Sequence, residues 1–175
     1  EIHIRDGSFR DWAGALDDAG RVEQDAPAKV LRLPSAVSVE GPEGASYVAA
    51  PAEGLRISAT IDYAHPVIGR QSGTFSLDQE GFARDIAPAR TFGFAREWDA
   101  LRARGLALGA SLENTVAVGE DGVLNDGLRF PDEFLRHKVG DLVGDLALLG
   151  TRLQAHVVAE RPGHAGNIRF ARALA

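Results

Sequence analysis

The amino-acid sequence predicts an α+β fold, a two-layer sandwich with helices on one face of a mixed or antiparallel sheet and a strand-helix-strand insertion. Short strand-like segments follow one another between residues 29 and 77, and they alternate apolar and polar residues. A long amphipathic helix is predicted over residues 131–150, and a further strand-like run follows it. Because the strands alternate, we expect one buried and one exposed sheet face.

Composition limits the class of protein. The 175 residues are enough to bury a sizeable core, and without cysteine the chain has neither disulfides nor thiolate metal ligands. Any zinc must therefore be held by histidine and carboxylate side chains. The formal net charge of −6 argues against a nucleic-acid partner. Since no apolar run approaches the ~18 residues of a membrane-spanning helix, we expect no transmembrane segment and a cytoplasmic location.

Residues 1–28 are predicted to be the end of an N-terminal domain and a linker. Alternation at 1–5 indicates a strand, and a turn at Asp6-Gly7 leads into a helix that is capped by Ser8 and stops at Gly20. The polar stretch 21–28 is typical of a linker. The first residue is not methionine, and the opening strand has no partner before it. We therefore expect further residues to precede the chain.

Residues 29–175 are predicted to form the second domain. Its first strands are expected at 30–33, 37–40, 47–50, 55–63 and 74–77. A helix capped by Asp78 should follow over 79–86 and end before Pro88. The strand-helix-strand insertion is then expected to consist of residues 91–94, a helix at 97–104, an apolar segment at 105–111 and a strand at 115–118.

The remaining segments surround the long helix at 131–150. Asp132 and Glu133 suit its positive N-terminal end, and Gly150 suits its C-terminal stop. After it we expect a strand at 153–159, a turn at 161–164 and a short helix at 167–175.

Three polar side chains, His137, Asp141 and Asp145, recur at four-residue steps along this helix, whose other positions are largely apolar. A step of four residues advances only ~40° beyond a full turn, so the three side chains lie along one stripe. A histidine and an aspartate one turn apart can both reach a zinc ion. The same spacing is also common in ordinary surface pairs, which contribute a few tenths of a kcal/mol. The spacing alone leaves both interpretations open.

Several long motifs resemble the UDP-3-O-acyl-N-acetylglucosamine deacetylases of lipid A synthesis. They are IAPARTFGF at 86–94, GLALGAS at 105–111, VLN at 123–125 and GLRFPDEFLRHK at 127–138. Shorter similarities occur at 1–8, 65–71, 140–150 and 163–164. The resemblance covers the whole chain. It corresponds to the second of that family's two related α/β domains and to the end of the first.

The resemblance implies a zinc site with catalytic roles for particular residues. His137 and Asp141 match two zinc ligands of the family. His164 matches its catalytic imidazole, and Asp145 matches the carboxylate that orients this imidazole. Thr91 matches the threonine that assists the metal in polarising the amide carbonyl.

The resemblance also implies a substrate, a UDP-linked acylated glucosamine. Phe92 and Lys138 match positions that contact the nucleotide-sugar. Phe94 matches the insertion that forms an apolar passage for the acyl chain, together with the whole apolar segment 105–111, which includes Leu106 and Ser111, and with the strand at 115–118.

The implied reaction is hydrolysis of the N-acetyl group, which gives UDP-3-O-acyl-glucosamine and acetate in the committed step of lipid A biosynthesis. The family's third zinc ligand and its general base, a histidine and an adjacent glutamate, fall before Glu1. We therefore expect this chain alone to be inactive and its N-terminal domain to be its partner. The alternative is a non-catalytic module that binds an acylated sugar or a protein. His164 opposite Asp145, with Thr91, favours the enzyme because a binding module does not need them.

Overall fold

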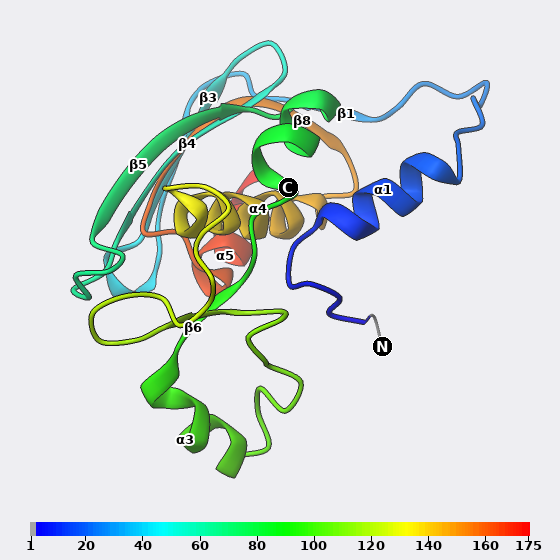
Figure 1. Cartoon of the computed structure of the whole chain (residues 1–175). Coiled ribbons are helices and arrows are strands. Elements are labelled where there is room, and N and C mark those ends of the chain that lie inside the picture. Colours follow the sequence, from blue (N-terminus) through cyan, green and yellow to red (C-terminus); the bar gives the residue numbers. More distant parts are fainter. Residues whose placement is uncertain (1–2) are drawn as a thin grey trace.

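The computed structural model describes residues 3–175 and shows a curved sheet with helices packed against one face (Figure 1). Within this range the main sheet has six strands, namely β1 (Val30–Arg32), β2 (Val37–Glu40), β3 (Ser46–Pro51), β4 (Leu55–Asp62), β5 (Arg70–Ser76) and β8 (Arg152–Glu160). Each coincides with a predicted strand, although β5 begins at Arg70 rather than at residue 74. The predicted α+β fold is confirmed.

The sheet is mixed rather than purely antiparallel. Its order is β2-β3-β8-β4-β5, and β1 pairs with the first residues of β8. Strand β8 is antiparallel to β3 but parallel to both β4 and β1. The parallel pairing arises because the chain returns to the sheet through a long crossover that includes a helix, and such a connection allows β8 to run in the same direction as β4.

Alternation along the strands gives the sheet one buried face. In β4, Ile57 and Ile61 are almost fully buried, whereas the intervening Ser58 and Thr60 are only partly covered. Burying one such isoleucine stabilises the fold by roughly 1.5–3 kcal/mol. The buried face therefore supplies the core against which the helices pack.

Two helices cover this face, α4 (Glu133–Ala147) and α5 (His164–Leu174), and they also contact each other. Most of the buried side chains of α4 are apolar and recur at helical spacing, namely Phe134, Leu135, Val139, Leu142 and Leu146. The helix is shorter than the predicted 131–150, since Pro131 and Asp132 form a turn before it. Gly150 has φ +64° just after the last turn, as expected of a glycine that ends a helix.

The N-terminal segment differs in part from the prediction. Residues 3–5 form no strand, because the chain bends there, with Arg5 at φ 56° and the Gly7 N–H donating to the Ile4 carbonyl at 3.0 Å. The first two residues of the predicted strand lie outside the described part. Helix α1 (Arg10–Asp18) is confirmed, and the Ser8 hydroxyl accepts the Arg10 N–H at 3.3 Å near its start. None of the residues of α1 is buried.

The predicted insertion is confirmed. Strands β6 (Phe92–Phe94) and β7 (Val116–Val118) pair in parallel, and the 3-10 turn η3 (Ala95–Glu97) and helix α3 (Trp98–Ala103) connect them. In Figure 1 this unit projects away from the main sheet. The remaining short elements are the 3-10 turn η1 (Pro42–Gly44), helix α2 (Gln79–Gly81) and the short π-helix η2 (Phe82–Ile86).

Candidate active site

His137 lies on the polar stripe of α4 and is held in one tautomer. Its Nδ1 is 3.1 Å from the Ala89 carbonyl oxygen, which can only accept, so Nδ1 carries the proton and Nε2 keeps a free lone pair. This Nε2 lies 3.5 Å from Asp141 Oδ1. Burial lowers the pKa of His137 below its ordinary value, although the charge of Asp141 opposes this. The imidazole is therefore in the neutral form that binds metals.

His164 faces the same stripe from α5. Its Nδ1 is 2.8 Å from Asp145 Oδ2, and its Nε2 is 3.9 Å from Asp141 Oδ2. The sequence predicted a turn at His164 and a helix from residue 167, and this boundary was wrong because α5 begins at His164 itself. Gly163 is extended and accepts the Asn167 N–H at 2.8 Å, which starts the helix early. His164 is thus directed by a helix rather than by a free turn.

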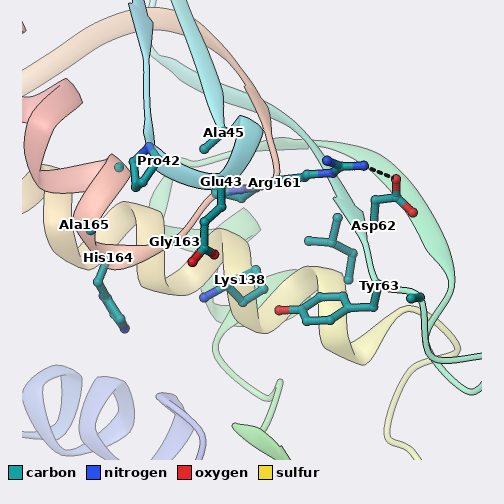
Figure 2. Close-up of a pocket in the computed structure, with 14 residues that line it drawn as sticks. Pro42, Glu43, Ala45, Asp62, Tyr63, Lys138, Arg161, Gly163, His164 and Ala165 are labelled. Carbon is teal, nitrogen blue, oxygen red and sulfur yellow. Dashed lines mark hydrogen bonds and ion pairs between the residues drawn. The ribbon is translucent and has the colours of Figure 1, made fainter.

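Lys138 adds a cation to the group. Its Nζ lies 2.8 Å from Asp141 Oδ2, and its side chain is largely buried. It lines a cavity of about 650 Å³ together with His164, Tyr63 and Arg161 (Figure 2). At the edge of this cavity the Arg161 guanidinium donates to Asp62 at 2.7 Å. The cavity therefore lies beside the histidine, and its wall has both cationic groups, Lys138 and Arg161, and carboxylates, Glu43 and Asp62.

Thr91 and Phe92 line a second cavity of about 610 Å³, and its other walls come from the insertion and the N-terminal segment, namely His3, Ile4, Gly93, Trp98, Leu101, Ala107, Gly109, Ala110 and Thr115. Of the segments predicted for the acyl passage, residues 107, 109, 110 and 115 line this cavity, whereas Phe94, Leu106 and Ser111 do not. Phe94 packs against Tyr63 and His65, Leu106 is 47% exposed, and Ser111 lies in a loop held by Asn114. The wall of this cavity is mostly apolar.

A buried ion pair that we did not predict holds the segment before Thr91. Glu133 is fully buried, and its Oε1 accepts both the backbone N–H and the Nε of Arg90, at 2.9 and 2.8 Å. Its Oε2 accepts the Arg129 N–H at 2.6 Å and Arg90 Nη2 at 3.0 Å. Burial alone would raise the pKa of Glu133, but these hydrogen bonds lower it, so the carboxylate is ionised. Local sequence does not indicate this burial, because a glutamate in a first helical turn is usually exposed.

The N-terminal segment packs against the site from the other side. The Phe9 ring stacks on the His137 ring, with centroids 5.2 Å apart. A Cβ on Gly140 would lie 2.3 Å from Phe9 Cε2, so this contact requires glycine at position 140. Asp6 accepts Arg129 Nη2 at 2.8 Å. Burial raises the pKa of Asp6, but hydrogen bonds from Ser8 and Arg129 outweigh it and lower this pKa to about 2.

The donor set suits part of a metal site. His137 Nε2 and the Asp141 carboxylate are nitrogen and oxygen donors of the kinds that zinc accepts. Within residues 3–175, no group of three or more histidine, aspartate or glutamate side chains is arranged to hold a metal ion. Catalytic zinc usually has three protein ligands. The chemistry of the two residues therefore fits two of the ligands of a zinc ion.

No helix in the described residues is both long enough and apolar enough to cross a bilayer.

Known proteins match the chain closely. The family model for LpxC, UDP-3-O-acyl N-acetylglycosamine deacetylase, matches residues 1–175. The UDP-3-O-acyl-N-acetylglucosamine deacetylase of Oleidesulfovibrio alaskensis is 49% identical over 99% of this chain and 57% of its own length. That of Myxococcus xanthus is 47% identical over 98% of this chain and 55% of its own length. The chain thus spans just over half the length of these relatives. It belongs to the UDP-3-O-acyl N-acetylglycosamine deacetylase family.

Proposed function

We propose that the chain is part of a zinc deacetylase that hydrolyses the N-acetyl group of UDP-3-O-acyl-N-acetylglucosamine to give UDP-3-O-acyl-glucosamine and acetate. The observation that carries this proposal is His164, which Asp145 holds at 2.8 Å beside the potential ligands His137 and Asp141. The family membership supports the same reaction. In this proposal residues 1–28 end a first domain, residues 29–175 form the second, and the first domain supplies a third ligand and a general base.

His137 and Asp141 would hold the zinc ion. When bound, zinc polarises an amide carbonyl and lowers the pKa of its water to ~7. The hydrogen bond from His137 Nδ1 to the Ala89 carbonyl keeps Nε2 directed away from the backbone, as a ligand needs. Lys138, 2.8 Å from Asp141 Oδ2, holds the carboxylate from its other side.

His164 would act as the general acid. Because Asp145 accepts a hydrogen bond from Nδ1–H, Nε2 is the nitrogen that can give a proton to the departing amine. The side chain is 68% exposed in this structure, so a substrate can reach it. Thr91 would donate a hydrogen bond from its hydroxyl to the amide carbonyl oxygen as negative charge develops there.

The two cavities would divide the substrate between them. The cavity beside Lys138 and His164 is lined by groups of both charges, and its cations Lys138 and Arg161 suit the phosphates of the nucleotide-sugar. The cavity lined by Phe92 and the insertion has mostly apolar walls that suit an acyl chain. Phe92 would also contact the sugar end, since it lies near His137, with ring centroids 6.4 Å apart.

Acetate release by the full-length protein tests the reaction. We expect it to depend on zinc and to stop when the metal is chelated, whereas the 175-residue chain alone should bind zinc weakly through two ligands. In the full-length protein Asp141→Ala should lose the metal. Calorimetry showing tight, stoichiometric zinc on the 175-residue chain would contradict the two-ligand assignment. Binding of the acylated nucleotide-sugar by zinc-loaded full-length protein without acetate release would instead indicate a non-catalytic module.

Enlarging Ala110 should shorten the acyl cavity. Ala110 lines this cavity, so Ala110→Leu should lower kcat/KM for long acyl chains more than for short ones. The physical reason is that each methylene kept out of water contributes ~0.8 kcal/mol. The measurement is kcat/KM across a series of acyl lengths in the full-length enzyme. Ala103→Leu, at the end of α3 and exposed, is the control, and an equal loss at every length would contradict the assignment.

A further inference from the structure

We infer that Asn167 and Tyr47 are positioning residues for His164. Asn167 would act through Asp145, and Tyr47 through Asn167 and the backbone of Gly163. This inference rests on the general-acid role of His164 proposed above. It is carried by a chain of hydrogen bonds that begins on β3 and ends at the imidazole.

The chain of contacts is continuous. Asn167 is fully buried, and its Nδ2 lies 2.9 Å from Asp145 Oδ2, the same oxygen that His164 Nδ1 approaches at 2.8 Å. The Tyr47 hydroxyl lies 2.8 Å from Asn167 Oδ1. The Gly163 N–H also reaches this hydroxyl, at 3.2 Å.

The donor and acceptor groups allow only one direction for the hydrogen bonds of this network. An ionised carboxylate only accepts hydrogen bonds, so Asn167 must present its NH₂ group to Asp145 and its carbonyl oxygen to Tyr47. The single proton of the Tyr47 hydroxyl therefore goes to Asn167 at 2.8 Å, rather than to the Gly163 carbonyl at 3.5 Å. A lone pair of the hydroxyl remains to accept the Gly163 N–H.

This direction has two consequences for the imidazole. Asp145 Oδ2 accepts hydrogen bonds from both Asn167 Nδ2 and His164 Nδ1. The bond from Asn167 holds the carboxylate in the position in which it can accept the bond from His164. The bond from Gly163 to Tyr47 fixes the backbone of the residue just before His164, where α5 begins. The same network therefore places both the ring and the residue that carries it.

Tyr47 is itself firmly held. It is 1% exposed, and its ring stacks on Phe170 with centroids 5.0 Å apart. A Cβ on Gly166 would lie 2.5 Å from the Tyr47 oxygen, so the first turn of α5 lies directly against the hydroxyl. Strand β3 thus contributes the Tyr47 hydroxyl to the network that positions the imidazole. A phenylalanine ring would fill the same space without making these hydrogen bonds.

Two variants remove the network with little change of volume. Asn167→Leu removes both hydrogen bonds, and Tyr47→Phe removes only the hydroxyl and keeps the stacking on Phe170. In the full-length enzyme Asn167→Leu should lower kcat about 10–100-fold, as is usual for partners behind a catalytic site, and leave KM and zinc content unchanged. Tyr47→Phe should lower kcat in the same way but by a smaller factor.

The control separates positioning from stability. Leu174→Ala removes a buried apolar side chain from the same helix α5 and changes no residue of the network. It should lower the melting temperature and leave kcat unchanged. A fall in kcat that follows the melting temperature equally in Leu174→Ala and Asn167→Leu would overturn the inference.

A readout without activity uses the 175-residue chain. At pH ~9 imidazoles are neutral, and ¹⁵N NMR then reports which nitrogen of His164 carries the proton. We expect Nδ1–H in the unmodified chain and a mixture with Nε2–H in Asn167→Leu and, to a lesser extent, in Tyr47→Phe. An unchanged spectrum in both variants would overturn the inference. Because this test needs no substrate, it is independent of whether the full-length protein releases acetate. If Asn167→Leu does not fold, Tyr47→Phe decides the same question.

Discussion

Replacing His164 with alanine in the full-length protein should lower the kcat of the proposed reaction by about 10²–10⁴-fold, the usual effect of losing a general acid. The reason is that the departing amine would lose its proton donor, whereas His137 and Asp141 would be untouched. Zinc content should therefore stay the same. Steady-state kinetics and metal analysis of the same preparation measure both quantities.

His156 provides a matched control. It lies on β8 and contacts Ser58 and Arg56 on the outer side of the sheet, away from the cavities. His156→Ala should change neither kcat nor zinc content. If His164→Ala instead lost zinc together with activity, His164 would be a metal ligand and the general-acid assignment would be wrong.

Replacing Glu133 with alanine should lower the free energy of unfolding by about 3–5 kcal/mol, the usual cost of breaking a buried ion pair. The substitution leaves the Arg90 guanidinium, whose side chain is only 13% exposed, and two backbone N–H groups without their acceptor. Urea unfolding of the 175-residue chain measures this change. Because Arg90 lies between Ala89 and Thr91, we also expect the support of His137 and the position of Thr91 to be disturbed.

The exposed ion pair between Asp17 and Arg21 is the control for the buried pair between Glu133 and Arg90. Asp17 accepts Arg21 at 2.8 Å, but both side chains are about half exposed or more. Asp17→Ala should cost only about 0–1 kcal/mol, because water screens such pairs. Glu133→Gln, which keeps the shape and loses the charge, should fall between the two. If Glu133→Ala cost no more than Asp17→Ala, the pair would not be an anchor of the site.

Local patterns predicted most of the elements. Alternation in β4 and helical spacing in α4 are properties of consecutive residues, so both could be identified without a structure. The boundaries were less accurate. Pro162 and Gly163 predict a turn at His164, whereas the hydrogen bond from the Asn167 N–H to the Gly163 carbonyl shows that the helix has already begun there.

The cavity residues show the limit of a motif. Thr91 and Phe92 line the second cavity, whereas Phe94, two residues further along β6, packs on Tyr63 and His65. The contact depends on where β4 and the following turn lie in space. A run of consecutive residues does not contain that information.

By itself, the sequence determined that His137, Asp141 and Asp145 share one stripe of a helix, because a four-residue step on a helix is a matter of local geometry. Tertiary structure decided which groups from distant segments face that stripe, although the family resemblance had already implied that Asp145 lies against His164. Ala89 sets the tautomer of His137, and His164 reaches Asp145 across nineteen residues of chain. Glu133 and Arg90 are further apart along the chain, as are Tyr47 on β3 and Asn167 on α5, and each pair is joined by hydrogen bonds. Such contacts arise from packing of the whole core, and nothing in the spacing of the residues along the chain specifies them.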